Sequence, residues 1–124
     1  MLVLYAEDDI DDFDFFCETI ESIDPATRCI NTRDGVETID YLENAMVLPD
    51  VIFLDINMPT MDGKSCLRNI KMDERFREIP VVIYTTSNSE RDKEHCLQLG
   101  AVGYVQKPTS IAEASDRLSR WVKV

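Results

Sequence analysis

The chain has 124 residues, 44% of them hydrophobic, which is typical of one ordinary globular domain. Its net charge of −11 argues against direct binding to nucleic acid or to an anionic membrane surface. No apolar run is long enough to span a membrane, no signal-peptide pattern is present, and the four cysteines form no C-x-x-C unit. We therefore expect a cytoplasmic protein whose cysteines are free thiols.

Strand and helix signals alternate from the start of the chain. Residues 1–6 form a short apolar run that predicts a strand, and an acidic segment, 7–12, follows at once. Apolar residues then recur at helical spacing from Phe13 onward, and Asp9 is the expected N-cap of this helix. A weaker strand signal lies at residues 28–31.

The middle of the chain contains the most apolar strand. Asp34 and Glu37 form a capping-box-like pair that opens a second helix. Residues 51–54 are four consecutive apolar residues, which predicts a strand buried on both faces. A turn at 61–63 leads into a third helix, with Leu67 on its apolar side.

The last third repeats the alternation. Residues 81–84 predict a fourth strand, and Ser87 with Glu90 predicts the start of a polar, lightly packed helix. A short fifth strand at 102–106 precedes a last helix capped by Ser110. Five strands that alternate with five helices predict an α/β fold: a doubly wound parallel sheet with helices on both faces.

Polar residues follow four of the predicted strands, at their carboxyl ends. Glu7 and Asp8 follow the first strand, Asp55 the third, Thr85 the fourth and Lys107 the fifth. Because these ends converge on one crevice in a doubly wound sheet, we expect the side chains to meet there. Clustered carboxylates favour a hard cation such as Mg²⁺, and an ammonium group would hold a phosphate oxygen. The pattern predicts a phosphoryl site with Asp55 as the acceptor.

Each of these residues also has an ordinary interpretation when it is taken alone. Asp55 could cap a helix or close a turn, Lys107 could be a surface lysine, and Thr85 could simply end a strand. Tyr104 could be a packing residue. The joint placement of the polar residues at four strand ends favours the functional interpretation.

Order and spacing of the motifs resemble the receiver domain of two-component response regulators, of the chemotaxis-regulator type, over essentially the full length, residues 1–124. The matching motifs are Glu7-Asp8-Asp9, Asp55-Ile56-Asn57-Met58-Pro59 with Met61-Asp62-Gly63, Thr85 after Val82-Ile83-Tyr84, and Gly103-Tyr104 leading to Lys107-Pro108. The resemblance implies a flavodoxin-like (βα)5 fold with strand order 2-1-3-4-5.

The resemblance also implies roles for the site residues. Asp55 would accept phosphate from a sensor histidine kinase or a histidine phosphotransfer protein. Asp8, Asp55 and the backbone carbonyl of Asn57 would bind Mg²⁺ directly, with Glu7 acting mainly through metal-bound water. Thr85 and Lys107 would bind the phosphoryl oxygens.

Signal output is implied as well. Thr85 and Tyr104 would be the switch residues, and Tyr104 would turn inward on activation. An output partner, or a second copy of the chain, would use the face made by the fourth helix, the fifth strand and the fifth helix. Lys107-Pro108 would be a cis peptide.

Three competing functions remain to be compared. A flavodoxin-type binding module would need a Ser/Thr/Gly-rich loop after the first strand, where this chain has the acidic segment 7–12. A Mg²⁺-dependent aspartyl-phosphate phosphatase would need a general acid at position 57, which is Asn57. A receiver-like interaction module that is never phosphorylated is disfavoured by the intact site residues. We expect no enzymatic turnover beyond self-phosphorylation and self-dephosphorylation.

Overall fold

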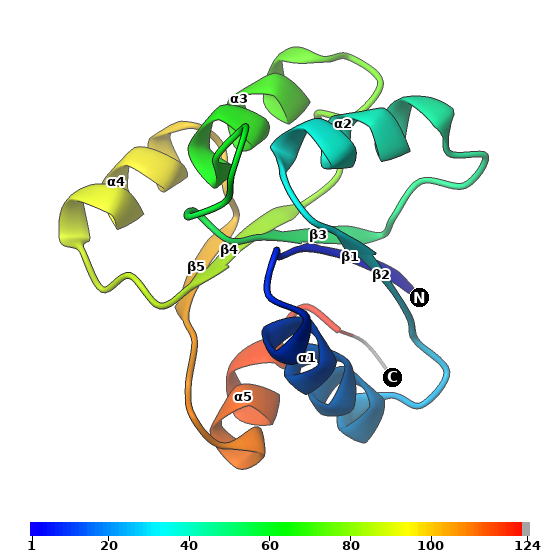
Figure 1. Ribbon diagram of the computed structural model, residues 1–124, viewed down its shortest axis with the longest axis vertical. Helices are drawn as coiled ribbons and strands as arrows, with labels where there is room; N and C mark the ends of the chain where they lie inside the picture. The colour runs from blue at the N-terminus through cyan, green and yellow to red at the C-terminus, as the bar shows by residue number, and fades with distance from the viewer. Residues whose placement is uncertain (123–124) are drawn as a thin grey trace.

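A parallel sheet of five strands forms the centre of the computed structural model, which describes residues 1–122 (Figure 1). The strands are β1 Leu2–Ala6, β2 Arg28–Thr32, β3 Val51–Leu54, β4 Val81–Thr85 and β5 Gly103–Gln106. The helices are α1 Ile10–Ile23, α2 Gly35–Asn44, α3 Gly63–Met72, α4 Glu90–Gln98 and α5 Ile111–Leu118. The strand order β2-β1-β3-β4-β5 confirms the predicted doubly wound, flavodoxin-like fold.

Helices cover both faces of this sheet. In Figure 1, α2, α3 and α4 lie on one side of the strands, and α1 and α5 lie on the other. No helix within residues 1–122 is long and apolar enough to cross a membrane. All four cysteines are free thiols, as expected.

The core has two layers, one on each face of the sheet. Strand β3 contributes to both, because successive side chains of a strand point to opposite faces. Ile52 and Leu54 pack toward α2, α3 and α4, whereas Val51 and Phe53 pack toward α1 and α5. All four side chains are buried, so the prediction of a strand covered on both faces is confirmed.

Aromatic rings fill the layer beneath α1. Tyr5 packs against Phe16 with ring centroids 4.4 Å apart and against Tyr84 at 5.6 Å. Phe16 also contacts Phe53 edge-on, at 5.2 Å. These four residues support the strand ends on which the polar site is built.

Polar side chains cap the helices where the sequence predicted, with one exception. Asp9, Asp34 and Ser110 each accept backbone N–H groups from the first turn of their helix. The predicted start of the fourth helix is wrong: Ser89, not Ser87, is the N-cap of α4.

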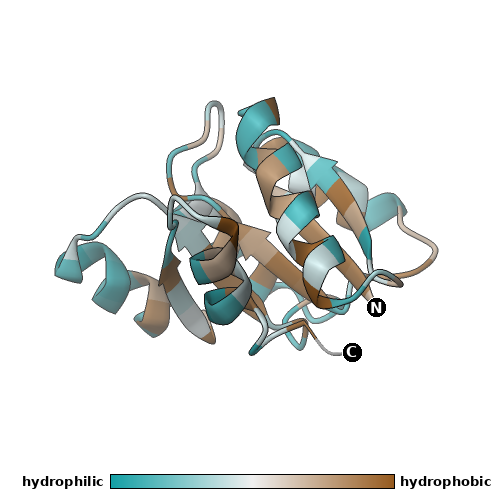
Figure 2. Cartoon of the chain, turned by 90° about the horizontal axis from the view of Figure 1, so that it is seen from below, coloured by the Kyte–Doolittle hydropathy of each residue, from teal (hydrophilic) through white to brown (hydrophobic). Residues whose placement is uncertain are grey.

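The shift in the α4 cap has a local physical reason. The hydroxyl of Ser89 accepts the N–H of Asp92 at 3.2 Å, which meets the geometry of an N-cap. Ser87 makes a different bond, because its hydroxyl donates to the Asp92 carboxylate at 2.8 Å. The rest of α4 is lightly packed, as predicted, with Cys96 as its buried residue. In Figure 2 the first turn of α4, at the left, is hydrophilic.

Candidate functional site

Lys107 joins the carboxylates at the carboxyl ends of the strands. Its ammonium donates to Asp55 Oδ2 at 2.9 Å, to Asp12 Oδ2 at 3.2 Å and to Glu7 Oε1. The Lys107 side chain is 11% exposed, against 2% for Glu7 and 10% for Asp55. The structure therefore brings together polar groups from the ends of β1, β3 and β5, as the sequence predicted.

Asp55 is positioned by backbone contacts on two sides. Its N–H donates to the carbonyl of Ala6 at 3.2 Å, which continues the pairing of β3 with β1 by one residue. On the other side the first residue of α3, Gly63, lies directly against it. A Cβ atom on Gly63 would be 2.1 Å from the carbonyl oxygen of Asp55, so only glycine allows α3 to approach this closely.

The surroundings keep Asp55 ionised. Burial alone would raise its pKa, but the charge of the Lys107 ammonium and the hydrogen bonding to Glu7, Lys107 and Thr85 together outweigh burial and lower the pKa below its ordinary value. An ionised carboxylate needs no general base to act as a nucleophile.

Glu7 and Lys107 respond in opposite ways to the same burial. Burial raises the pKa of Glu7 to about 7, although Lys107 opposes the shift. Burial would lower the pKa of Lys107, but its contacts with Glu7 and Asp55 outweigh this and raise the pKa. Lys107 is therefore a permanent cation in the site.

Two residues of this site were missed by reasoning from the sequence. The hydroxyl of Tyr5 is buried and donates to Glu7 Oε1 at 2.9 Å. Tyr5 lies two residues before Glu7, and the period of a strand places such residues on one face, so this signal was available. Asp12 lies in the first turn of α1. Because this helix starts beside the site, its first turn was a place to look for a further site residue.

The predicted metal ligands are only partly gathered. Glu7 and Asp55 meet at Lys107, whereas the neighbouring Asp8 is exposed to solvent. Within residues 1–122 no group of at least three His, Cys, Asp or Glu side chains is arranged as a ready metal cluster. The donor set still suits Mg²⁺, which prefers oxygen ligands, uses few carboxylates and keeps several waters.

The predicted switch residues are connected through one loop residue. Thr85 is buried at the end of β4, and its Oγ1 accepts the N–H of Ser87 at 3.4 Å. The hydroxyl of Tyr104 donates to the carbonyl of Ser87 at 3.1 Å. Tyr104 therefore reaches the loop between β4 and α4, and both switch candidates contact the same residue.

The cis-peptide prediction for Lys107-Pro108 is wrong. The described part of the chain, residues 1–122, contains no cis peptide bond. The trans form is intrinsically favoured before proline by about 0.5–1 kcal/mol, and Lys107 reaches its carboxylate partners with it.

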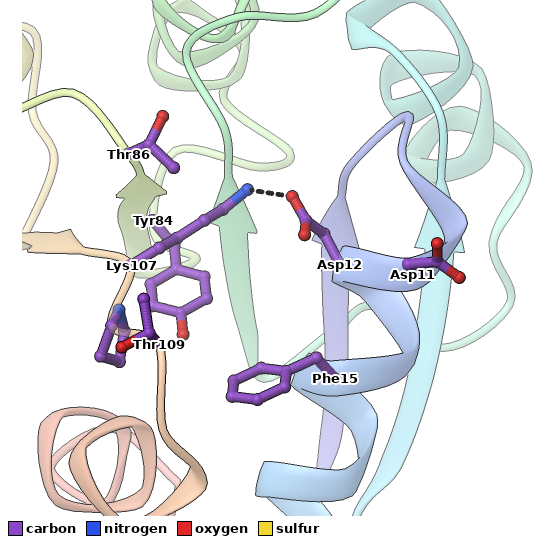
Figure 3. A pocket seen from close by; sticks show the side chains of 8 residues that line it. Asp11, Asp12, Phe15, Tyr84, Thr86, Lys107 and Thr109 are labelled. Atoms are coloured by element: carbon purple, nitrogen blue, oxygen red, sulfur yellow. Dashed lines mark hydrogen bonds and ion pairs between the residues drawn. The ribbon is translucent and has the colours of Figure 1, made fainter.

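A cavity of about 390 Å³ opens beside Lys107 (Figure 3). It is lined by Asp11, Asp12, Phe15, Tyr84, Thr86, Lys107, Pro108 and Thr109. Its walls therefore come from the start of α1, the end of β4 and the segment between β5 and α5. The cavity gives solvent access to the ammonium side of the site.

Comparison with curated proteins gives relatives of two kinds. The chain is 38% identical over 85 residues to the probable methanogenesis regulatory protein FilR2 of Methanothrix harundinacea, a match to 65% of this chain and 55% of FilR2. The chain thus spans about half the length of that relative. It is 33% identical over 120 residues to the polar-differentiation response regulator DivK of Brucella ovis, covering 97% of this chain and 94% of DivK.

Solved structures share the fold over nearly the whole chain. The phosphorylated cyanobacterial phytochrome response regulator RcpA superposes with a TM-score of 0.89 and 27% identity, covering 98% of this chain and 94% of RcpA. The receiver domain of the sensor histidine kinase PA1611 of Pseudomonas aeruginosa PAO1 has a magnesium ion in its active-site cleft. It superposes with a TM-score of 0.80 and 29% identity, covering 98% and 96% of the two chains.

The family match covers the sheet from Val3 onward and every residue of the polar site. Residues 3–119 match the family described as the response regulator receiver domain. Together with the fold and the relatives above, this match shows that the chain belongs to the family of response regulator receiver domains.

Proposed function

We propose that Asp55 accepts a phosphoryl group from the phosphohistidine of a sensor kinase or of a histidine phosphotransfer protein. The observation that carries the proposal is the buried Asp55 carboxylate with its lowered pKa, 2.9 Å from the Lys107 ammonium. The chain would act in the cytoplasm as a signalling receiver that is phosphorylated and dephosphorylated. It would not be an enzyme that turns over a separate substrate.

The proposed transfer uses the groups around Asp55. An oxygen of Asp55 attacks phosphorus while the bond from phosphorus to the donor imidazole nitrogen breaks, and that nitrogen leaves with the electron pair. The Lys107 ammonium, 2.9 Å from Asp55 Oδ2, and the Thr85 hydroxyl would bind the oxygens on which charge develops. Burial of these groups keeps their hydrogen bonds strong, because few waters compete.

A divalent cation is the cofactor that we propose for this step. Asp8, Asp55 and the carbonyl of Asn57 would hold Mg²⁺, with Glu7 acting through a bound water. When bound, Mg²⁺ neutralises charge on the phosphoryl and acceptor oxygens. The magnesium ion in the PA1611 receiver domain supports this choice of metal.

Signal output would pass through the loop that Thr85 and Tyr104 share. A phosphoryl oxygen that takes the Thr85 hydroxyl changes the contact of Thr85 with Ser87, and Tyr104 is bonded to Ser87. The surface that changes would be α4, β5 and α5, and an output partner or a second copy would dock there. The light packing of α4 supports two arrangements of similar free energy.

The phosphatase alternative has less support. Release of phosphate to water in repeated turnover needs a general acid beside the nucleophile. Asn57 occupies the position expected for it, and a carboxamide does not transfer a proton in this way.

Phosphorylation with acetyl phosphate and Mg²⁺ tests the proposal. Intact-mass measurement should show one phosphoryl group on the wild type and none on Asp55→Asn. Asp40→Asn, a change of an exposed aspartate on α2, is the matched control and should be phosphorylated like the wild type. An unchanged adduct on Asp55→Asn would overturn the assignment of the acceptor.

Amide-resolved NMR with beryllofluoride, a phosphoryl mimic, tests the output path. We expect shifts in the loops around Asp55 and also across residues 88–106. Shifts confined to the loops would reject the coupling to the α4, β5 and α5 face.

A further inference from the structure

Asp12 contacts the same ammonium group as the acceptor Asp55. Its carboxylate lies 3.2 Å from Lys107 Nζ, and Figure 3 shows the two side chains, which both line the cavity, pointing toward each other. The Asp12 side chain is 50% exposed, in contrast to Lys107 at 11%. It comes from α1, the element after β1, and capping does not require it, because Asp9 is the cap.

The ammonium of Lys107 is fully used in this arrangement. An ammonium group has three N–H donors, and Glu7, Asp12 and Asp55 supply one carboxylate each. A phosphoryl group on Asp55 brings further acceptor oxygens and negative charge to the same donors. The donor that Asp55 used passes to the phosphoryl group, whose additional oxygens compete with Glu7 and Asp12 for the other two donors.

Burial determines whether Lys107 loses its contact with Glu7 or its contact with Asp12. The Glu7 contact is the deepest, since that side chain is 2% exposed and losing it would leave a buried carboxylate with fewer partners. The Asp12 carboxylate is half exposed, so water can replace the ammonium at little cost.

We propose that Asp12 is a positioning residue that competes with the phosphoryl group on Asp55 for the Lys107 ammonium. The proposal rests on the function proposed above, because it concerns the same site. Asp12 holds the Lys107 ammonium by an ion pair in the resting state, and its negative charge repels the phosphoryl group that shares this ammonium. Asp12 thereby weakens the phosphorylated state and favours its return to the resting state.

Asp11 provides a matched control within the same turn of α1. Both aspartates lie in the first turn of α1 and line the same cavity, so both act on the helix dipole in a similar way. The ion pair with Lys107 is made by Asp12. A difference between Asp12→Asn and Asp11→Asn therefore reports the Lys107 contact, and not the loss of one negative charge.

The dissociation constant for beryllofluoride, measured with saturating Mg²⁺, is the direct readout. We expect Asp12→Asn to bind beryllofluoride about two- to fivefold more tightly than Asp11→Asn at low ionic strength, the range of a half-exposed ion pair. The ratio of the two constants should approach one near 1 M salt, where the screening length is about 3 Å. Asp12→Ala and Asp11→Ala repeat the comparison without the amide oxygen of Asn.

The outcomes separate this inference from the proposed function. A wild type that takes no phosphoryl group on Asp55 would overturn both. A wild type that is phosphorylated on Asp55, with Asp12→Asn and Asp11→Asn binding beryllofluoride equally, would overturn the role of Asp12 alone. Weaker binding by Asp12→Asn would also overturn it, because Asp12 would then orient Lys107 toward the phosphoryl group.

Discussion

Replacing Lys107 with methionine removes a buried cation and leaves its carboxylate partners in place. Glu7 and Asp55 are the buried partners, at 2% and 10% exposure of their side chains. Removing one partner of a buried ion pair costs about 3–5 kcal/mol, because a charge is left without compensation. The half-exposed Asp12 adds little to this cost. Protonation of one carboxylate offsets part of the cost, so we expect Lys107→Met to lower the free energy of unfolding by about 3 kcal/mol at pH 7.

Urea denaturation in EDTA, followed by circular dichroism, measures this loss. The loss should shrink in the background of Asp55→Asn, because one buried charge is then already absent, and a double-mutant cycle gives the coupling directly. Lys93→Met, a change of an exposed lysine on α4, is the control for removing a positive charge. A loss below about 1 kcal/mol, the upper range of an exposed ion pair, would refute the reasoning.

Three further predictions test other parts of the site. Gly63→Ala should lower the free energy of unfolding by about 1–3 kcal/mol in urea denaturation and slow phosphorylation by acetyl phosphate, because a Cβ there meets the Asp55 carbonyl at 2.1 Å. Burial raises the pKa of Glu7 from 4.5 to about 7, so the folded state holds a proton that the unfolded state has lost between these pH values. In EDTA the stability of the wild type should therefore fall as pH rises from 5 to 8, and Glu7→Gln should reduce that slope. Tyr104→Phe should cost about 0.5–1.5 kcal/mol in urea denaturation, the net value of its hydrogen bond to the Ser87 carbonyl.

Each of these predictions has a contrary result. Wild-type stability for Gly63→Ala would mean that α3 can move back from Asp55 without cost. A wild-type slope retained by Glu7→Gln would place the titrating group elsewhere. Full stability of Tyr104→Phe would show that water replaces the bond to Ser87.

Patterns of apolar residues predicted the architecture because the sheet is buried on both faces. Residues 51–54 form β3 with the predicted bounds. Four consecutive apolar residues are typical of a short strand that is buried on both faces of a parallel sheet. The first strand and the fourth were also found, to within a residue at each end. Strand ends then placed Asp55 and Lys107 correctly, because position along a parallel strand fixes which edge of the sheet a residue occupies.

Side-chain partners were harder to predict than positions. The contact of Asp12 with Lys107 depends on the direction of a helix relative to the sheet, which no spacing rule supplies. The α4 cap failed for a related reason, since Ser87 and Ser89 both lie ahead of the helix and only the local backbone decides which one caps it. The role of Gly63 depends on a close approach between two segments and could not be read from a turn motif.

The close approach of Gly63 also makes the surroundings of Asp55 unequal in stiffness. On the α3 side the Asp55 carbonyl faces backbone atoms at van der Waals contact, and repulsion between such atoms rises steeply with compression. On the α4 side the structure is tied by polar bonds, from Ser87 to Asp92 at 2.8 Å and from Asp92 to Lys64 at 2.7 Å. Such bonds can exchange with water at modest cost. The backbone at Asp55 is therefore confined on the α3 side, whereas the α4 side is held by bonds that water can replace, so we expect structural change to begin on the α4 side.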